Sequence, residues 1–103
     1  MESFDLILIK KIALLDDVLT HPIGKKSMLF KIETEREFNL NETATRMLNI
    51  LLESTSIEAA YNQLLQEYKI APEFLQKDLL ALIEKLVYCQ LIAIKNPVSE
   101  EEV

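Results

Sequence analysis

The chain has few of the residues that form disulfides, metal sites or catalytic groups in many small proteins. Its 103 residues include one cysteine, one histidine, one glycine and no tryptophan. The single cysteine, Cys89, excludes an internal disulfide, and no cysteine–histidine pair has the spacing of a metal site. No run of eighteen apolar residues could span a bilayer, and no basic region precedes the apolar start, so a signal peptide is not expected. We therefore expect a cytoplasmic protein without metal or cofactor.

What the chain does contain is enough apolar sequence for one core. Half of its residues are apolar, which excludes a disordered chain, and its length suits a single domain. We expect that domain over residues 1–95, with an ambiguous and mainly extended segment at 1–13 and an acidic, flexible tail at 96–103. The net charge of −6 argues against a protein that binds nucleic acid through phosphates.

The clearest local signal is a change of period in the middle of the chain. From Arg36 to Leu40 the apolar residues alternate, which is typical of a strand. Helical spacing follows at once, with the apolar residues Ala44, Met47, Leu48 and Leu51. Asn41 stands at the change, where its side chain can cap the first helical turn. The pattern predicts a strand that runs directly into a helix.

Two more strands are expected before this joint. Residues 12–20 read as a first strand, and residues 28–32 alternate with one mainly apolar face. Turn chemistry separates them at Pro22 to Gly24, where the only glycine can adopt a positive φ. A polar turn at Glu33 to Glu35 precedes the third strand, over 36–40. Such short connections favour a three-stranded antiparallel meander.

Three helices are expected after the meander. The first covers about residues 42–53, and Thr55 with Glu58 has the spacing of a capping box for the second. Pro72 suits the first position of a third helix, which should extend to about residue 89. Residues 91–94 read as a short strand or extended arm. A sheet followed by three helices indicates an α+β fold of the winged helix-turn-helix type.

The third helix is more apolar than one buried face requires. Its first stripe consists of Leu75, Leu79, Leu82 and Leu86, and its second of Leu80, Ile83, Val87 and Leu91. The second stripe is either covered by the N-terminal segment, through Phe4, Leu6 and Leu8, or lines a groove. The strand at 36–40 is also weakly protected for an edge strand. An open strand beside an apolar helix is a receptor for an extended peptide.

The order of these elements resembles the PqqD-like family, the peptide-recognition domain of ribosomal natural-product biosynthesis. The resemblance covers about residues 28–92. It is carried by Met28-Leu29-Phe30, Phe38-x-Leu40-Asn41-Glu42-x-Ala44, Met47-Leu48-x-Ile50-Leu51, Ser56-Ile57-Glu58, Leu64-Leu65-x-x-Tyr68-x-Ile70, Lys77-Asp78-Leu79 and Leu82-x-x-x-Leu86-x-x-x-x-Leu91-Ile92. Two family glycines are absent, because Glu53-Ser54-Thr55 follows the first helix and Gln90 precedes the final Leu-Ile pair.

The resemblance implies a winged-helix-like domain that binds and does not catalyse. Members of the family capture the leader of a precursor peptide as an added strand. They then present it to a modifying enzyme, often a radical-SAM protein. Carried onto this chain, the peptide-binding residues would be Glu37, Phe38, Asn39 and Leu40 on the strand, with Leu79, Leu80, Ile83 and Val87 on the helix.

Two other functions fit the same elements. A winged-helix DNA-binding domain is possible in this fold, but the third helix carries a net negative charge. A homo-oligomeric scaffold could pair the open strand and apolar helix with a second copy, so a monomer or a weak homodimer is expected. No catalytic constellation is apparent, since Asp16-Asp17 and His21 have no nucleophile or base beside them. Cys89 near a helix C-terminus is disfavoured as a thiolate.

Overall fold

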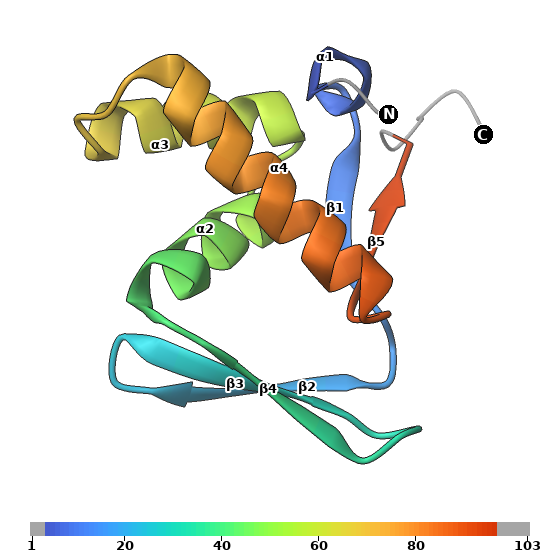
Figure 1. The fold of residues 1–103 in the computed structure, drawn as a ribbon. Helices are drawn as coiled ribbons and strands as arrows, with labels where there is room; N and C mark the ends of the chain where they lie inside the picture. The colour runs from blue at the N-terminus through green and yellow to red at the C-terminus, as the bar shows by residue number, and fades with distance from the viewer. Residues whose placement is uncertain (1–3, 97–103) are drawn as a thin grey trace.

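The computed structural model describes residues 4–96, and nine elements follow one another along this part of the chain. In order they are α1 (Phe4–Ile7), β1 (Lys11–Leu14), β2 (Val18–Ile23), β3 (Lys26–Lys31), β4 (Arg36–Leu40), α2 (Glu42–Glu53), α3 (Ile57–Glu67), α4 (Pro72–Tyr88) and β5 (Ile92–Lys95) (Figure 1). The α+β class, the meander and the three long helices after it are confirmed.

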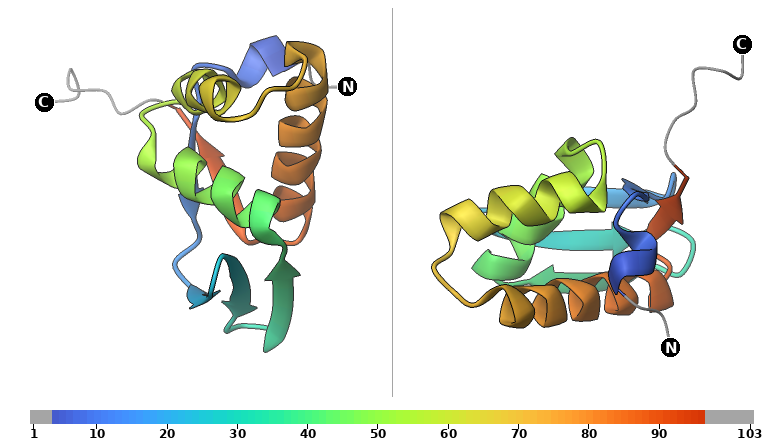
Figure 2. Two further views of the ribbon diagram at one scale, coloured as in Figure 1. Left: turned by 90° about the vertical axis from the view of Figure 1, so that its left-hand side faces the viewer. Right: turned by 90° about the horizontal axis from the view of Figure 1, so that it is seen from above.

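The strands form two separate antiparallel sheets. The larger sheet is the meander β2-β3-β4, and the smaller one pairs β1 with β5. Figure 1 shows the meander as a lower layer, with α2 and α4 above one of its faces. Both views in Figure 2 keep the β1–β5 pair beside the C-terminal half of α4, away from β4. The core therefore lies between the helices and one face of the meander.

The first predicted strand, over residues 12–20, is wrong in one respect, because the structure divides it between the two sheets. The predicted strand is interrupted by the turn before β2, where the N–H of Leu15 donates to the carbonyl of Leu91 at 3.1 Å. The carbonyl of Asp17 accepts from the N–H of Ile32 at 2.9 Å. The residue before this turn is thus hydrogen-bonded next to β5, and the turn itself is hydrogen-bonded next to β3. Pro22 lies inside β2, and the turn is formed by Gly24, with φ +63°, and Lys25.

Strand β3 has the predicted alternation, but its more apolar face is not the one turned to the core. Ser27, Leu29 and Lys31 are buried, whereas Met28 and Phe30 are only half-buried. Ser27 and Lys31 are accommodated because each has a polar partner: Thr45 Oγ1 lies 2.9 Å from Ser27 Oγ, and Lys31 donates to a carboxylate. Counting apolar residues therefore misassigns the inward face of a strand whose buried polar groups are paired.

The strand-to-helix joint forms as its local chemistry predicts. Asn41 is the N-cap of α2, and its Oδ1 accepts from the N–H of Ala44 at 2.8 Å. Pro72 opens α4 as expected. The expected capping box of α3 is wrong by one residue, because Ser56 is the N-cap and accepts from the N–H of Ala59 at 3.0 Å. Local side-chain chemistry thus sets all three helix starts to within a residue.

A tertiary contact satisfies further N–H groups at the start of α3. The N–H groups of Ile57 and Glu58 donate to the carbonyls of Lys10 and Leu8, at 2.8 and 2.9 Å. The loop before β1 therefore satisfies the first two free N–H groups of α3, and Ser56 satisfies the third. The ammonium of Lys11 donates to the carbonyls of Leu52 and Ser54 at the C-terminus of α2, at 3.1 and 2.8 Å. The N-terminal segment thus joins the ends of two helices.

The N-terminal segment itself begins as a helical turn, so the expectation of extended chain over 1–13 is wrong for α1. Phe4 and Ile7 are buried, and the Phe4 ring meets Tyr61 edge to face with centroids 5.3 Å apart. Leu6 is 62% exposed and contributes little to the core, contrary to the sequence interpretation. The predicted tail beyond Asn96 lies outside the described residues, and the domain boundary stays a prediction.

Helix α4 ends in a left-handed cap although it lacks the family glycine. Gln90 has φ +60°, and its N–H donates to the carbonyl of Val87 at 2.9 Å. The N–H of Leu91 reaches back to the carbonyl of Leu86 at 3.0 Å. This pair of bonds is a Schellman motif, and the buried side chains of Leu86 and Leu91 complete it. The chain therefore reverses into β5 at a residue that carries backbone strain.

Candidate functional site

The β4 edge of the meander is unoccupied in the part of the chain that the structure describes. Strand β4 pairs with β3 on one side only, and no other described backbone group is hydrogen-bonded to residues 36–40. The N-terminal segment does not cover this edge, since Lys11–Leu14 pairs with β5. Alternate N–H and C=O groups of β4 are therefore available to a further strand.

The four strand residues predicted for the site divide between the two faces of the sheet. Phe38 lies opposite the buried Leu29, so it faces the helices together with Leu40. Phe38 is half-buried against the core and Leu40 is buried. Glu37 and Asn39 are exposed on the opposite face. A strand added to β4 would thus meet an apolar surface on the helix side and a polar one outside.

A pocket of about 310 Å³ lies where β4 comes near the C-terminal end of α4. Its lining residues are Lys31, Thr34, Arg36, Phe38, Tyr88, Cys89 and Gln90. The strand contributes Arg36 and Phe38, and the guanidinium carbon of Arg36 lies 5.2 Å from the centroid of the Phe38 ring. The structure therefore brings the open strand and the end of the helix together around one cavity.

The structure places the predicted helix residues elsewhere. Leu79 is completely buried, so it supports the helix from within the core. Leu80, Ile83 and Val87 line a second pocket, of about 340 Å³, whose other lining residues are Ile7, Glu84, Tyr88 and Ile94. No residue of β4 lines that pocket. The second apolar stripe of α4 therefore faces α1 and β5, where Ile7 covers part of it.

The flank of α4 that faces β4 is a different one. Cys89 lines the pocket beside Phe38, and helical spacing places Lys85 and Leu82 on the same flank as Cys89. Leu82 is half-buried and Lys85 is exposed. Sequence periodicity identified both apolar stripes but could not show which of them faces the strand, because that depends on how the helix is rotated on the sheet.

The pocket beside β4 also contains a buried ammonium group. Lys31 Nζ donates to Asp17 Oδ1 at 2.9 Å, and the lysine side chain is only 5% exposed. This hydrogen bond from Lys31 lowers the pKa of the Asp17 carboxyl, and a further bond from the N–H of Glu33 acts in the same direction. The Asp17 carboxylate therefore stays ionised and balances the charge of the lysine.

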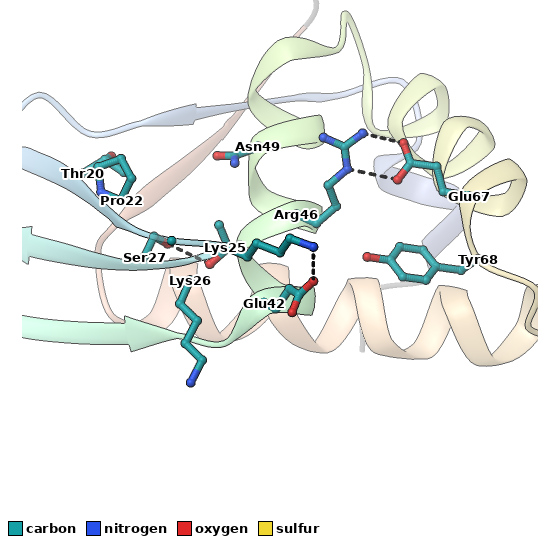
Figure 3. A pocket seen from close by; sticks show the side chains of 12 residues that line it. Thr20, Pro22, Lys25, Lys26, Ser27, Glu42, Arg46, Asn49, Glu67 and Tyr68 are labelled. Atoms are coloured by element: carbon teal, nitrogen blue, oxygen red, sulfur yellow. Dashed lines mark hydrogen bonds and ion pairs between the residues drawn. The ribbon is translucent and has the colours of Figure 1, made fainter.

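A larger pocket, of about 460 Å³, lies toward the β2 edge on the same helix-covered face of the meander, between the β2–β3 hairpin and α2 (Figure 3). Arg46 binds Glu67 through two hydrogen bonds, of 3.0 and 2.6 Å, which join α2 to α3. The bond from Arg46 lowers the pKa of Glu67, and the same bond raises the pKa of Arg46. Lys25 lies 3.9 Å from Glu42. Arg46 and Lys25 thus already have carboxylate partners.

Two further properties bear on the function. None of the described helices is both long and apolar enough to cross a membrane. Within residues 4–96, no group of three histidine, cysteine, aspartate or glutamate side chains is arranged to hold a metal ion.

The comparison with protein families decides the classification. The model of the family described as coenzyme PQQ synthesis protein D (PqqD) matches residues 26–92, from β3 to the start of β5. The chain belongs to the PqqD family. No curated protein matches it. The matched segment includes β4, which forms the open edge, and α4, whose C-terminal end adjoins the pocket beside that edge.

Two solved structures share the fold of this PqqD-family chain. TbiB1 in complex with the TbiA(beta) leader peptide has a TM-score of 0.72 and 22% identity, covering 77% of this chain and 92% of TbiB1. Lasso peptide synthetase B1 complexed with the leader peptide has a TM-score of 0.74 and 19% identity, covering 81% of this chain and 98% of the synthetase chain. At these identities the likeness is one of fold.

Proposed function

We propose that this PqqD-family protein is a binding domain that captures the leader of a ribosomal precursor peptide by adding it as a strand to β4. The observation that carries the proposal is the free edge of Arg36–Leu40 beside the C-terminal half of α4. The strand supplies backbone hydrogen bonds, and the helix side supplies a surface for every second side chain of the peptide. The protein itself then needs no catalytic group.

The two structures that share the fold support this assignment, because both were obtained with a leader peptide bound to the similar chain. The geometry of this chain adds a chain-specific reason. Phe38 is half-buried and lines the pocket, so a peptide side chain can extend the apolar surface that Phe38 begins. Of the predicted strand residues, Phe38 and Leu40 would contact peptide side chains on the helix side, and Glu37 and Asn39 on the outer side.

The helix side of the groove is assigned here to Leu82, Lys85 and Cys89. These residues replace the four predicted helix residues in the proposed contact set, because Leu79 is buried in the core and the other three line the pocket beside Ile7 and Ile94. Two or three apolar anchors, each worth about 1.5–3 kcal/mol, less the cost of ordering the peptide, give an affinity of about micromolar. Such an affinity suits a protein that must later release the peptide.

The second part of the proposal is that a modifying enzyme receives the captured peptide, as the PqqD-like resemblance implies. When the leader is added as a strand to β4, the other edge of the leader strand and the remainder of the precursor stay free. The part to be modified therefore extends away from this domain. The enzyme, which in this family is often a radical-SAM protein, would then act on a substrate that is held at a fixed distance.

An NMR titration tests the peptide-binding proposal. Synthetic peptides covering the N-terminal part of each short reading frame beside this gene are added to ¹⁵N-labelled protein. One of them should bind saturably, with shift changes concentrated at residues 36–40 and 82–90. Hydrogen exchange should slow at the β4 amides that point away from β3, because these gain partners.

A matched pair of variants locates the site. Lys85→Glu, on the flank beside β4, should weaken binding. Glu84→Lys, at the preceding residue of α4 and beside the other pocket, should change binding little. Shift changes confined to α1, α3 and β5 would place the peptide on a different surface. Failure of every neighbouring reading frame to bind would count against a leader-binding role.

A further inference from the structure

Two basic side chains lie directly opposite each other on the helix side of the sheet. In the β3–β4 register Lys31 is the partner of Arg36, so both side chains project to the same face and both line the pocket beside α4. Like charges at directly opposed positions of a sheet destabilise it. A pair of this kind in a chain of net charge −6 calls for a local explanation.

Among residues 4–96, a single carboxylate is paired with either of these two cations. Asp17 is bonded to Lys31, and the Asp17 carboxyl does not line the pocket. Arg36 takes part in no ion pair within residues 4–96. Its guanidinium lies over the face of the Phe38 ring, which leaves the guanidinium hydrogen-bond donors available. The pocket thus has one positive charge without a counter-charge.

The end of helix α4 does not repel an anion as strongly as its dipole would suggest. The carbonyls of Lys85, Leu86 and Val87 already accept from the N–H groups of the cap. Gln90, Thr34 and Tyr88 add polar side chains to the lining. An anionic group in this pocket would therefore meet donors on several sides, with the two cations beneath it.

We propose that the pocket beside Arg36 is a subsite for an acidic side chain of the bound peptide. This inference rests on the strand addition to β4 proposed above. Side chains of an added strand alternate between faces, and Arg36 and Phe38 are two residues apart on the same face. The peptide therefore carries its aspartate or glutamate two residues from a large apolar side chain. The spacing is the same whether the added strand runs parallel or antiparallel to β4.

A peptide selection tests the subsite without knowledge of the natural leader. A library of random twelve-residue peptides is displayed and selected on the full-length protein. Aspartate or glutamate should be enriched at one position, two residues from a large apolar residue. Selection on Arg36→Glu should exchange this preference for lysine or arginine. Lys26→Glu, an exposed cation at the start of β3 that does not line the pocket, should leave the preference unchanged.

Affinities then quantify the contact. Because the protein contains no tryptophan, a tryptophan at one end of a selected peptide reports binding by fluorescence. Replacing the acidic residue of the peptide by its amide should weaken binding about three- to tenfold on the wild-type protein and hardly at all on Arg36→Gln. Circular dichroism of both Arg36 variants checks that they remain folded.

The outcomes separate this inference from the proposed function. Selected peptides that shift the β4 amides but show no acidic preference, or that keep it on Arg36→Glu, overturn the subsite and leave strand addition intact. Peptides that bind while the amides of residues 36–40 stay unchanged overturn both. Loss of the preference on Lys26→Glu as well would show a general charge effect, which also overturns the subsite.

Discussion

Lys31 on β3 and Asp17, in the turn before β2, form an ion pair of 2.9 Å that closes the end of the meander nearest to the pocket. The lysine is buried with its charge, and the carboxylate is about one-third exposed. The carbonyl of Asp17 also accepts from the N–H of Ile32. Both the side chain and the backbone of Asp17 thus tie the start of β2 to the end of β3.

The two members of this pair should respond differently to substitution. Asp17→Asn leaves a buried ammonium without its counter-charge, so we expect the melting temperature to fall by several degrees at about pH 7. Lys31→Met removes the buried charge and leaves a carboxylate that water can reach, so the fall should be smaller. Thermal denaturation of both variants measures the difference. A larger loss for Lys31→Met would show that the lysine is not buried in the charged form.

The same pair predicts how stability depends on pH. The hydrogen bond from Lys31 lowers the pKa of Asp17 below its ordinary value of 3.8 in the folded protein. Its stabilising contribution is therefore complete above that ordinary value and is lost as the pH falls through the lower, folded value. The melting temperatures of wild type and Asp17→Asn should converge in strongly acidic solution. The Arg46–Glu67 pair is present in both proteins and cancels from this comparison.

The strained cap of α4 can be relieved. Gln90 has a positive φ that glycine adopts without cost, so Gln90→Gly should raise the free energy of unfolding by about 1 kcal/mol and the melting temperature by about 4–8 °C. Gln66→Gly, at an exposed position within α3, should instead lower the free energy of unfolding by about 1 kcal/mol. Denaturant unfolding distinguishes the two. Equal losses for both would exclude a left-handed Gln90.

The contribution of α1 to the core can be measured by a neighbouring pair of truncations. Phe4 is buried against Tyr61, so Phe4→Ala should cost about 3 kcal/mol of unfolding free energy. Leu6 is largely exposed on the same turn, and Leu6→Ala should change the stability by less than about 0.5 kcal/mol. If Phe4→Ala proved as mild as Leu6→Ala, α1 would not be part of the folded core.

The single cysteine reports whether the groove is occupied. Cys89 is half-buried and lines the pocket beside Phe38, so a bound peptide should slow its reaction with an aromatic disulfide reagent about tenfold. The probe is the peptide that binds in the NMR titration, at saturating concentration. As the control, a cysteine at Thr43, an exposed position on α2, is placed in a Cys89→Ser background and should react at the same rate with and without peptide. An unprotected Cys89 would move the peptide away from this pocket.

Much of the fold follows from signals that lie close together in sequence. Asn41 caps α2 and Pro72 opens α4 because each acts on the residues that immediately follow it. Gly24 takes the positive φ of the hairpin turn for a similarly local reason. The edge position of β4 also follows from short connections, since a meander must leave its last strand at an edge.

Several of the errors involve partners that are distant in sequence. The sheet of β1 and β5 joins Lys11 to Lys95, and no local pattern marks either as the partner of the other. The capping of α3 by the carbonyls of Leu8 and Lys10 is hidden for the same reason. The rotation of α4 is a third case, because both of its apolar stripes have the same period and only the packed neighbours distinguish them.

The amino-acid sequence by itself determined the strand-to-helix joint at Asn41, the place of β4 as the last strand of the meander and the membership of the PqqD family, because all three depend on the order and spacing of residues along the chain. Only the tertiary structure decided which flank of α4 faces that edge, and that Lys31 and Arg36 share one pocket there. Those relationships arise when the helices pack on the sheet. There the free energy of burying apolar side chains and pairing buried charges outweighs the conformational preferences of single residues.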